Sequence, residues 1–422
     1  MPLTYIDIFA GAGGLSEGFV RNGHIPVAHV EMNKEACLTL KTRTCYYYLK
    51  ANNRLDDYYR YLKKEISRDE LYDMVPETLL DTVIQETMNA GGMQDLFVRI
   101  DSLMLKQNIR TIDVLVGGPP CQAYSLVGRA RSANNMKGDP RNYLYQLYAD
   151  VLEYYKPKMF VFENVLGLQT ANGGKYLTDM KSRFEAAGYD LDLKVLTASD
   201  YGVLQNRKRV ILIGKKHTVG KKFEYPDIEK VGEEFQEYLV NDLLSDLPEL
   251  QPGTEKFNYS GEPTEYLKKT KIRTKDDVLT WHVARPNREQ DREIYRCVIR
   301  AWNQENPIRL KYTDLPEDLC THNNRKAFLD RFKIVASNLH TSQTMVAHIS
   351  KDGHYFIHPD IEQARSLSVR EAARIQSFPD NYYFEGGRTA AFLQIGNAVP
   401  PLMANAIAEA VTRLLEEDNY GK

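Results

Sequence analysis

Short runs of β-branched and aromatic residues alternate with amphipathic helical stretches through the first half of the chain, and this alternation constrains the fold more than any other feature. The runs are LTYIDIF (3–9), IPVAHVE (25–31), LFVRID (96–101), IDVLVGG (112–118) and MFVFENV (159–165). Strands separated by helices are typical of a parallel sheet with helices on both faces. We therefore predict a doubly wound, mostly parallel α/β fold.

Two further patterns extend this sheet. Apolar residues recur at helical spacing from Leu144 to Tyr155 and stop before Pro157, which predicts a crossover helix between the last two runs. The segments 191–198 and 209–216 flank a polar turn and predict a closing antiparallel pair. The Tyr-rich segment 40–92 is predicted to be a helical insert, and we assign it no chemistry.

The strand–helix alternation disappears after Lys216, and we predict a second, smaller domain over 216–345. Residues 216–260 hold five Lys and Arg against ten Asp and Glu, whereas 261–340 hold sixteen against twelve, with aromatic residues interleaved. A basic, aromatic surface is a weak sign of a nucleic-acid interface, and a solvated surface over core aromatics explains the composition equally well. The candidate nucleic-acid contacts, to bases or to phosphates, are Arg273, Arg285, Arg288, Arg292, Arg325 and Arg331.

The end of the chain is predicted to return to the sheet. Ser368 and Glu371 match a capping box that opens a helix before Pro379. Pro401 then begins a last helix whose apolar residues share one face: Met403, Ile407, Val411 and Leu414. We expect 391–422 to complete a catalytic domain begun by 1–215, with 346–390 as the connection.

Composition excludes several classes of protein. In 422 residues, 55 Lys and Arg face 57 Asp and Glu, so the net charge of −2 offers no global attraction to a polyanion. The first ten residues carry no basic n-region, and no apolar run has the length that spans a bilayer, so we expect a soluble protein that is not secreted. The five cysteines lack CxxC spacing, so we expect neither disulfides nor a metal site, and a reducing cytoplasm.

A glycine-rich turn, Ala10-Gly11-Ala12-Gly13-Gly14, follows the first predicted strand and opens a helix. Such a turn lets a ligand approach backbone N–H groups, and Glu31, at the end of the second strand, is placed to bind a ribose. This pattern predicts a nucleoside-binding crevice without separating NAD from S-adenosylmethionine. Asp101, at the end of the third run, is predicted to accept a hydrogen bond from an adenine amino group, although it could equally cap a helix.

The fourth predicted strand ends in GGPPCQAYS (117–125). A lone cysteine usually packs inertly. Here two prolines stiffen the turn, and Cys121 follows them at the carboxyl edge of a parallel sheet, where ligands bind in such folds. We therefore interpret Cys121 as a nucleophile.

These residues together resemble the DNA cytosine-5 methyltransferases, which use S-adenosylmethionine. The matching blocks, in the order of that family, are DIFAGAGGLSEGF (7–19), GGPPCQAYS (117–125), ENV (163–165), QNRKR (205–209), RSLSVREAARIQSFP (365–379) and IGNAVPP (395–401). Ser368-Val369 stands where the family more often has Thr-Pro. The resemblance leaves out 40–92 and most of 216–345. It implies a Rossmann-like class I methyltransferase fold with a target-recognition domain.

The resemblance also implies catalytic roles. Cys121 would add to carbon 6 of cytosine, and a protonated Glu163 would donate to N3 and hold the exocyclic amine. Arg207 would fix the base at its carbonyl and Arg209 would order the site, with both guanidinium groups on one face of an extended segment. QNRKR alone could also be a solvated basic turn. No base for removing the carbon 5 proton is indicated.

Further positions carry implied contacts. The cofactor residues are Phe9, Ala10, Gly11, Gly13, Glu31, Met32, Asp101, Leu144, Asn397, Ala398 and Val399, and the substrate residues are Pro120, Gln122, Ser125, Arg129 and Gln205. Residues 126–141 resemble the family's mobile loop, which closes over the flipped nucleotide; a basic surface loop is the alternative.

The leading hypothesis is methylation of cytosine at a short duplex DNA sequence, with S-adenosylhomocysteine as product. We expect a monomer, encoded by a bacterium or phage and paired in some settings with a restriction endonuclease. Methylation of cytosine in tRNA is the first alternative. An NAD-dependent oxidoreductase would leave Cys121 and Glu163 unexplained, and a non-catalytic DNA binder would not need them.

Overall fold

The structure, a computed structural model, describes residues 2–120, 143–220, 222–326 and 328–420. Its sheet has seven strands in the order β3-β2-β1-β4-β5-β7-β6. The strands are β1 Thr4–Ile8, β2 Ile25–Glu31, β3 Val83–Gln85, β4 Val114–Gly117, β5 Met159–Asn164, β6 Tyr189–Thr197 and β7 Lys208–Lys216. β1 to β5 pair in parallel, and β7 runs antiparallel to both β5 and β6. The doubly wound sheet and the closing antiparallel pair are confirmed.

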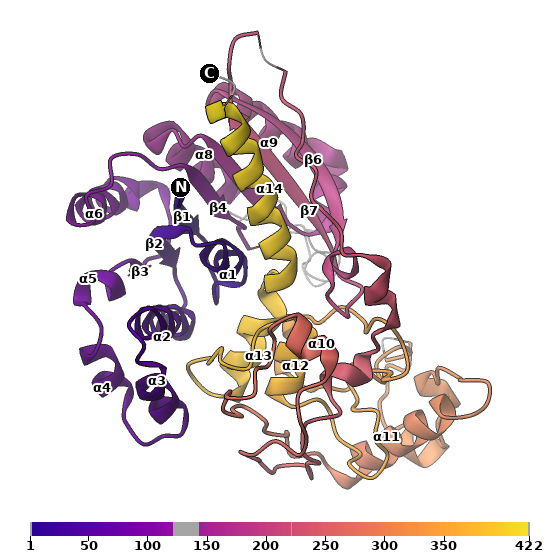
Figure 1. Ribbon diagram of the computed structural model, residues 1–422. Helices are drawn as coiled ribbons and strands as arrows, with labels where there is room; N and C mark the ends of the chain where they lie inside the picture. The colour runs from indigo at the N-terminus through magenta and orange to yellow at the C-terminus, as the bar shows by residue number, and fades with distance from the viewer. Residues whose placement is uncertain (1, 121–142, 221, 327, 421–422) are drawn as a thin grey trace.

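Helices surround the sheet and build a second part below it (Figure 1). They are α1 Gly14–Arg21, α2 Lys34–Ala51, α3 Leu55–Leu62, α4 Arg68–Asp73, α5 Glu77–Leu80, α6 Met93–Lys106, α8 Leu144–Tyr155, α9 Lys175–Ala186, α10 Glu265–Lys269, α11 Glu289–Trp302, α12 Val369–Ile375, α13 Arg388–Asn397 and α14 Pro401–Tyr420. Within the described ranges, no helix has the length and apolar character to cross a membrane.

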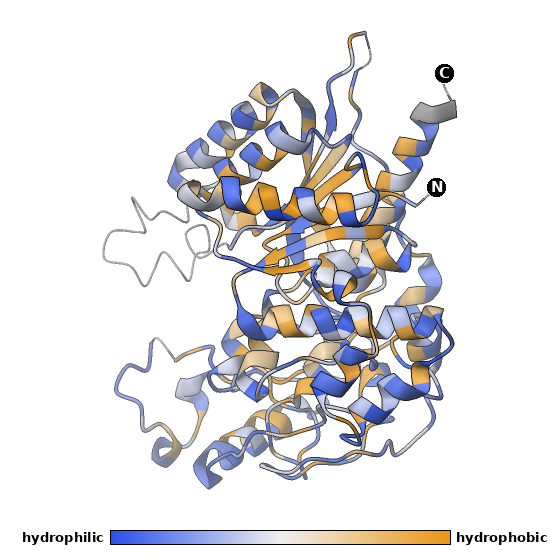
Figure 2. Cartoon of the chain, turned by 90° about the vertical axis from the view of Figure 1, so that its left-hand side faces the viewer, coloured by the Kyte–Doolittle hydropathy of each residue, from blue (hydrophilic) through white to orange (hydrophobic). Residues whose placement is uncertain are grey.

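Strand alternation sends buried side chains to two opposite cores. Leu115 and Phe160 pack with α6, α8 and α9 on one face of the sheet. Val116 and Val161 pack with α1 and α14 on the other. Figure 2 shows the strands as an apolar layer between helices whose outer faces are polar. A parallel sheet covered on both faces leaves the carboxyl ends of its strands as the place where a ligand can reach backbone and side chains.

The second part, called the lower part below, contains α10, α11, α12 and α13. It has its own apolar cores, and none of its described residues belongs to a strand of the sheet. One core unites α10, α12 and α13 with Val240, Leu243 and Phe356. Another gathers around α11. The predicted capping box is confirmed, because Ser368 Oγ accepts from the Glu371 amide and Glu371 accepts from the Ser368 amide.

The predicted strand at 96–101 is wrong, because these residues lie inside α6. Leu96, Phe97 and Ile100 are buried, which is the spacing of one helix face, whereas Val98 is 58% exposed. The third strand is instead the three-residue β3, which lies within the segment predicted to be a helical insert. That segment is helical in α2 to α5 and ends as a helical region at Leu80.

The last helix returns to the sheet as predicted. α14 packs along α1, and Met403, Ile407 and Val411 are fully buried there. Gly18 makes this packing close, since a Cβ at Gly18 would lie 2.2 Å from the carbonyl carbon of Ala404. Figure 1 shows α14 running beside α1 through the centre of the molecule.

Candidate active site

The turn between β1 and α1 has a left-handed backbone conformation that glycine adopts readily. Gly11 and Gly13 have φ of 54° and 79°, and Phe9, at 58°, shares this left-handed conformation. The Gly13 amide donates to Ala10 O at 2.9 Å. At Gly14 a Cβ would lie 2.3 Å from Val399 O. The turn is therefore tight, and the segment after α13 presses directly against it.

Glu31 lies beside this turn in a fixed orientation. Its Oε2 accepts from the Gly11 amide at 2.8 Å, and its Oε1 accepts from the Asn33 amide at 2.8 Å. Met32, which follows, is 60% exposed. A carboxylate held by two amides at the carboxyl edge of the sheet is suited to accept hydrogen bonds from the two hydroxyls of a ribose.

Asp7, on β1, is a second carboxyl group at this edge. It is buried, and neither carboxyl oxygen has a hydrogen-bond partner among the described residues. Burial and the nearby Glu31 raise the pKa of Asp7 well above its ordinary value. A buried acceptor of this kind is satisfied by a proton or by a cationic group. The ammonium of the methionine moiety makes S-adenosylmethionine a chemical fit to this edge.

The adenine role predicted for Asp101 fails with the strand that carried it. Asp101 lies in α6, where it accepts from the hydroxyls of Tyr154 and Tyr155 at 2.7 and 3.1 Å. The end of the true third strand holds Gln85 and Glu86. Gln85 is the parallel partner of Glu31, and the Glu86 amide donates to Glu31 O at 3.0 Å. A strand of three residues leaves no periodic pattern that could have predicted it.

The turn before Cys121 is held against two neighbouring strands. A Cβ at Gly117 would lie 2.2 Å from Ile8 O, and one at Gly118 would lie 2.7 Å from Glu163 Oε2. Asn164 Nδ2 donates to Pro119 O at 3.4 Å. Pro120 is exposed. The remaining predicted site residues of this segment lie outside the described residues: Cys121, Gln122, Ser125 and Arg129.

Glu163 and Arg209 meet next to this turn. Arg209 Nε lies 2.7 Å from Glu163 Oε1, and each side chain is 13% exposed. β5 and β7 are antiparallel neighbours, with Glu163 opposite Ile211, so the two side chains come from adjacent strands. The pair places a carboxyl group and a guanidinium together, with Glu163 next to Gly118 in the turn that ends at Pro120.

The predicted direction of Arg207 is wrong. Its guanidinium is fully buried and donates to three carbonyls, those of Met345 at 2.6 Å, Gly396 at 3.3 Å and Ala398 at 2.9 Å. The alternation argument fails because β7 begins only at Lys208 and the Arg207 amide turns back to Gln205 O. Of the two arginines, Arg209 is the one that pairs with Glu163.

Gln205, predicted to bind substrate, is likewise used inside the protein. Its Nε2 donates to Gln376 Oε1 at 2.6 Å, and its Oε1 accepts from the Met345 amide at 2.8 Å. Gln376 Nε2 in turn donates to Ala398 O at 2.9 Å. Gln205, Arg207 and Gln376 thus fasten the segment that carries Asn397, Ala398 and Val399.

That segment lies at the glycine turn, where Val399 O and Ala398 approach Gly14. Asn397 ends α13 and is exposed, whereas Ala398 and Val399 are buried. Leu144 is the first residue of α8 and is partly buried against the sheet core. Among the described residues, no group of three His, Cys, Asp or Glu side chains is placed to hold a metal ion.

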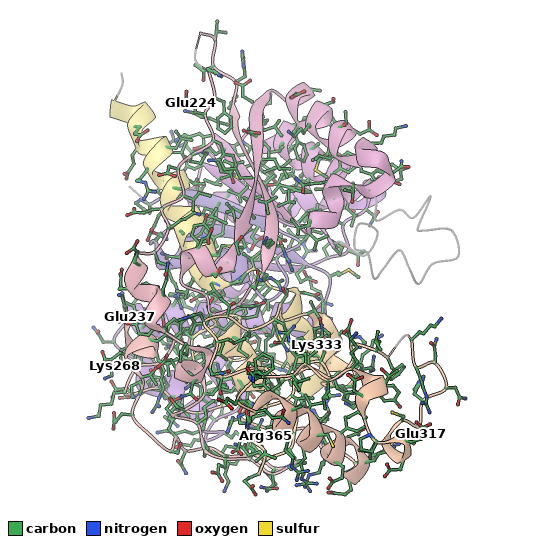
Figure 3. All side chains as sticks on the ribbon, turned by 90° about the vertical axis from the view of Figure 1, so that its right-hand side faces the viewer. Glu224, Glu237, Lys268, Glu317, Lys333 and Arg365 are labelled. Carbon is green, nitrogen blue, oxygen red and sulfur yellow. The ribbon has the colours of Figure 1, made fainter. Side chains whose placement is uncertain are left out.

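The predicted DNA-contacting arginines fall into three groups according to their partners. Arg273 is buried and pairs with Asp246, so its assignment to a DNA contact is wrong. Three others are paired with a surface carboxylate: Arg292 with Glu289, Arg325 with Glu317 and Arg331 with Asp352. Glu317 lies at the outer edge of the lower part (Figure 3). Arg288 and Arg285 form no ion pair with a described carboxylate.

Comparisons with known proteins give the family. The model of the C-5 cytosine-specific DNA methylases matches residues 87–413. The type II methyltransferase M.Bpa9945I of Bacillus paralicheniformis is 44% identical, covering 97% of this chain and 98% of that protein. M1.HphI of Haemophilus parahaemolyticus, also a type II methyltransferase, is 31% identical over 98% of this chain and 88% of its own length.

Solved structures support the fold. A prophage-encoded E. coli protein superposes with a TM-score of 0.61 at 21% identity, covering 98% of this chain and 99% of that one. The S. pombe Dnmt2 methyltransferase gives 0.53 at 13% identity, covering 98% and 99%. The chain therefore belongs to the C-5 cytosine-specific DNA methylases and is a DNA cytosine-5 methyltransferase.

Proposed function

We propose that the chain methylates carbon 5 of a cytosine flipped out of a specific duplex DNA sequence, through a covalent adduct with Cys121. The contact between Glu163 and Arg209 beside the Pro119-Pro120 turn carries this proposal. Carbon 5 is a poor nucleophile until a thiolate adds to carbon 6, and that addition places negative charge on the ring. A carboxyl group and a guanidinium next to the cysteine turn are the partners such a ring needs.

In this proposal Cys121 forms the bond to carbon 6. Glu163 in its protonated form donates to N3 and holds the exocyclic amine, and Arg209 lies toward the base carbonyl. Gly118 keeps Glu163 close to the turn, because any side chain there would displace its carboxyl group. Once carbon 5 carries the methyl group, water takes the carbon 5 proton, the 5,6 double bond re-forms, and the bond from carbon 6 to Cys121 breaks to release the thiolate.

For the cofactor we propose S-adenosylmethionine, which supplies the methyl group when bound and leaves as S-adenosylhomocysteine. Glu31 would bind the ribose, Asp7 the methionine ammonium, and Gly11 and Gly13 would allow close approach of the ligand to the turn. Gln85 and Glu86 take over from Asp101 as candidates for the adenine edge.

We propose residues 216–345 as the target-recognition domain, reading base edges while basic side chains contact phosphates. Arg285 and Arg388 support an anion contact where this segment meets α13. Arg285 NH2 donates to Ile349 O at 2.7 Å, and burial and the neighbouring Arg388 lower the pKa of Arg285. Neither arginine has an ion-pair partner among the described carboxylates. A phosphodiester would neutralise both.

Replacing Arg388 by Ala is expected to weaken DNA binding three- to tenfold for every sequence. The slope of log K against log salt concentration should fall by about 1, because one phosphate contact is lost. The measurement is fluorescence anisotropy with duplex DNA over a salt series. Lys268→Ala is the matched control, since Lys268 is neutralised by Glu265 at 2.7 Å. An unchanged salt slope would remove Arg388 from the DNA interface.

The function is tested by expressing the chain in a host that lacks cytosine methylation and sequencing its bisulfite-treated DNA against an empty-vector control. Protection of cytosines in one short motif would support both reaction and specificity. Protection found only in tRNA would favour the alternative substrate. The bacterial type II relatives favour DNA, and we propose action on bacterial or phage DNA in the cytoplasm, as a monomer, with a restriction endonuclease of the same specificity as a candidate partner.

A further inference from the structure

Three segments far apart in the sequence meet behind the glycine turn. They are the first turn of α1 with Glu17, the middle of α2 with Arg43, and the segment after α12 with Asn381 and Tyr382. All four residues are buried. Figure 1 shows α1, α2 and the segment that joins α12 to α13 gathered on the same side of the molecule.

Arg43 is the centre of this cluster. Its Nε and NH2 donate to the two carboxylate oxygens of Glu17 at 2.9 and 2.6 Å, and its NH1 donates to Asn381 Oδ1 at 2.9 Å. The guanidinium carbon lies 4.0 Å from the ring centroid of Tyr46 and 4.7 Å from that of Tyr382. A planar cation that is both paired and stacked is rigidly held.

Glu17 and Tyr382 transmit this rigidity to the turn from two sides. The Glu17 amide donates to Gly13 O at 2.8 Å, so Glu17 follows the turn within one helical turn. The Tyr382 hydroxyl donates to Ala12 O. A Cβ at Gly13 would lie 3.0 Å from that hydroxyl oxygen. The backbone of the turn is therefore held by Glu17 and Tyr382 through two of its carbonyls.

We propose that Tyr382, held in place by Arg43, is a positioning residue for the cofactor and sets the glycine turn in its binding geometry. The inference rests on the proposed binding of S-adenosylmethionine. A ligand that binds through backbone amides depends on their preorganisation, since a loop that must be ordered on binding lowers affinity. The hydroxyl of Tyr382 touches the turn, whereas Arg43 acts through Tyr382 and Glu17.

Tyr58, on α3, provides a matched control. It is also fully buried, and its hydroxyl also donates to a main-chain carbonyl, that of Asn381 at 2.8 Å. It is part of the same aromatic cluster, with its ring centroid 5.2 Å from that of Tyr46. Tyr382→Phe and Tyr58→Phe therefore remove the same group with the same burial, but only the first removes a contact to the turn.

The test measures the Kd of S-adenosylhomocysteine and S-adenosylmethionine by calorimetry, with Tm recorded for each protein. Tyr382→Phe is expected to raise the Kd of both ligands about tenfold. For Tyr58→Phe the Kd of both ligands should stay within twofold of the wild-type value, while Tm falls by about as much as in Tyr382→Phe. The Kd for duplex DNA without cofactor and kcat at saturating cofactor should change by less than twofold in both.

Equal ligand affinity in wild type and Tyr382→Phe would overturn the inference. Equal loss of affinity in both Phe variants would overturn it too, since affinity would then follow general stability. If Tyr382→Phe does not fold, Arg43→Lys takes its place, with an expected three- to tenfold rise in Kd. Arg21→Lys is its control, because Arg21 also pairs with Glu17, at 3.1 Å, but its side chain is 18% exposed. A wild type that binds neither ligand would refute the proposed function itself.

Discussion

Arg209→Ala is expected to lower the single-turnover rate of methylation by about 100- to 1,000-fold, the usual cost of removing one group that stabilises charge in a transition state. Arg209 and Glu163 are each only 13% exposed, so leaving Glu163 without this partner should also lower the free energy of unfolding, by about 1–3 kcal/mol. The loss of rate should greatly exceed what this loss of stability can explain. Cys121→Ser serves as the inactive reference.

Arg207→Ala should behave in the opposite way. It removes one donor from each of three buried carbonyls. The Ala398 carbonyl keeps its bond from Gln376, whereas the Met345 and Gly396 carbonyls lose this donor, and each buried group left without a partner costs about 1–3 kcal/mol. We expect a large fall in Tm, measured by calorimetry, and any folded fraction should retain the Glu163–Arg209 pair. If Arg209→Ala keeps its rate within threefold of wild type, or if Arg207→Ala is fully stable, the assignment of these two arginines is wrong.

The free energy of unfolding is expected to fall steeply between pH 7 and pH 5, by about 3–4 kcal/mol. His282 and His358 are buried in the lower part, and burial lowers their pKa values to about 4 and about 3. In the unfolded chain both take up protons below about pH 6.5. Because the folded state does not, stability is lost as the pH falls below that value.

Glu371 acts in the same direction at lower pH. Burial alone would raise the pKa of Glu371, but Arg365, bound through two oxygens at 2.7 Å, outweighs it and lowers the pKa. Its contribution is present above about pH 4.5 and is lost as the pH falls further. Arg365 lies inside the lower part (Figure 3), so this cluster holds the segment that precedes α12.

Urea unfolding at pH 7, 6 and 5 measures this effect, and His282→Gln is the informative variant. His282 lies between Ser368 Oγ at 3.0 Å and Pro248 O at 2.7 Å, contacts that an amide can largely replace. The free energy of unfolding of the variant should depend less steeply on pH than that of wild type, because unfolding takes up about one proton fewer. This holds whatever the stability of the variant at pH 7. A slope equal to that of wild type would show that His282 does not titrate on unfolding.

The sequence predicted those parts of the fold whose patterns are long enough to be unambiguous. β2 and α8 have the bounds that their apolar runs indicated, and the capping box at Ser368 has the expected bonds. β3 was missed because three residues carry no periodicity. The run at 96–101 was misread because Leu96, Val98 and Ile100 alternate as a strand does, while Phe97 and Leu103 complete a helix face that only packing could reveal.

The site shows the same limit. Motifs located the turn at Gly11, the carboxylate of Glu31 and the pair of strands that carry Glu163 and Arg209. The motifs could not predict whether Arg207 or Arg209 lies beside Glu163, because that depends on where β7 begins. The positioning role of Tyr382 had no sequence signal, since its hydroxyl bonds to a carbonyl 370 residues away along the chain.

The packing of α14 against α1 has a consequence for synthesis in the cell. Ribosomes make the glycine turn and its helix first, yet the apolar face of α1 is covered only when residues after Pro401 emerge. Contacts of such long sequence separation form late. The apolar face of α1 therefore stays exposed in the nascent protein until α14 has been made. Methylation can begin only after α14 has been made, so a ribosome that stalls before α14 releases no active enzyme.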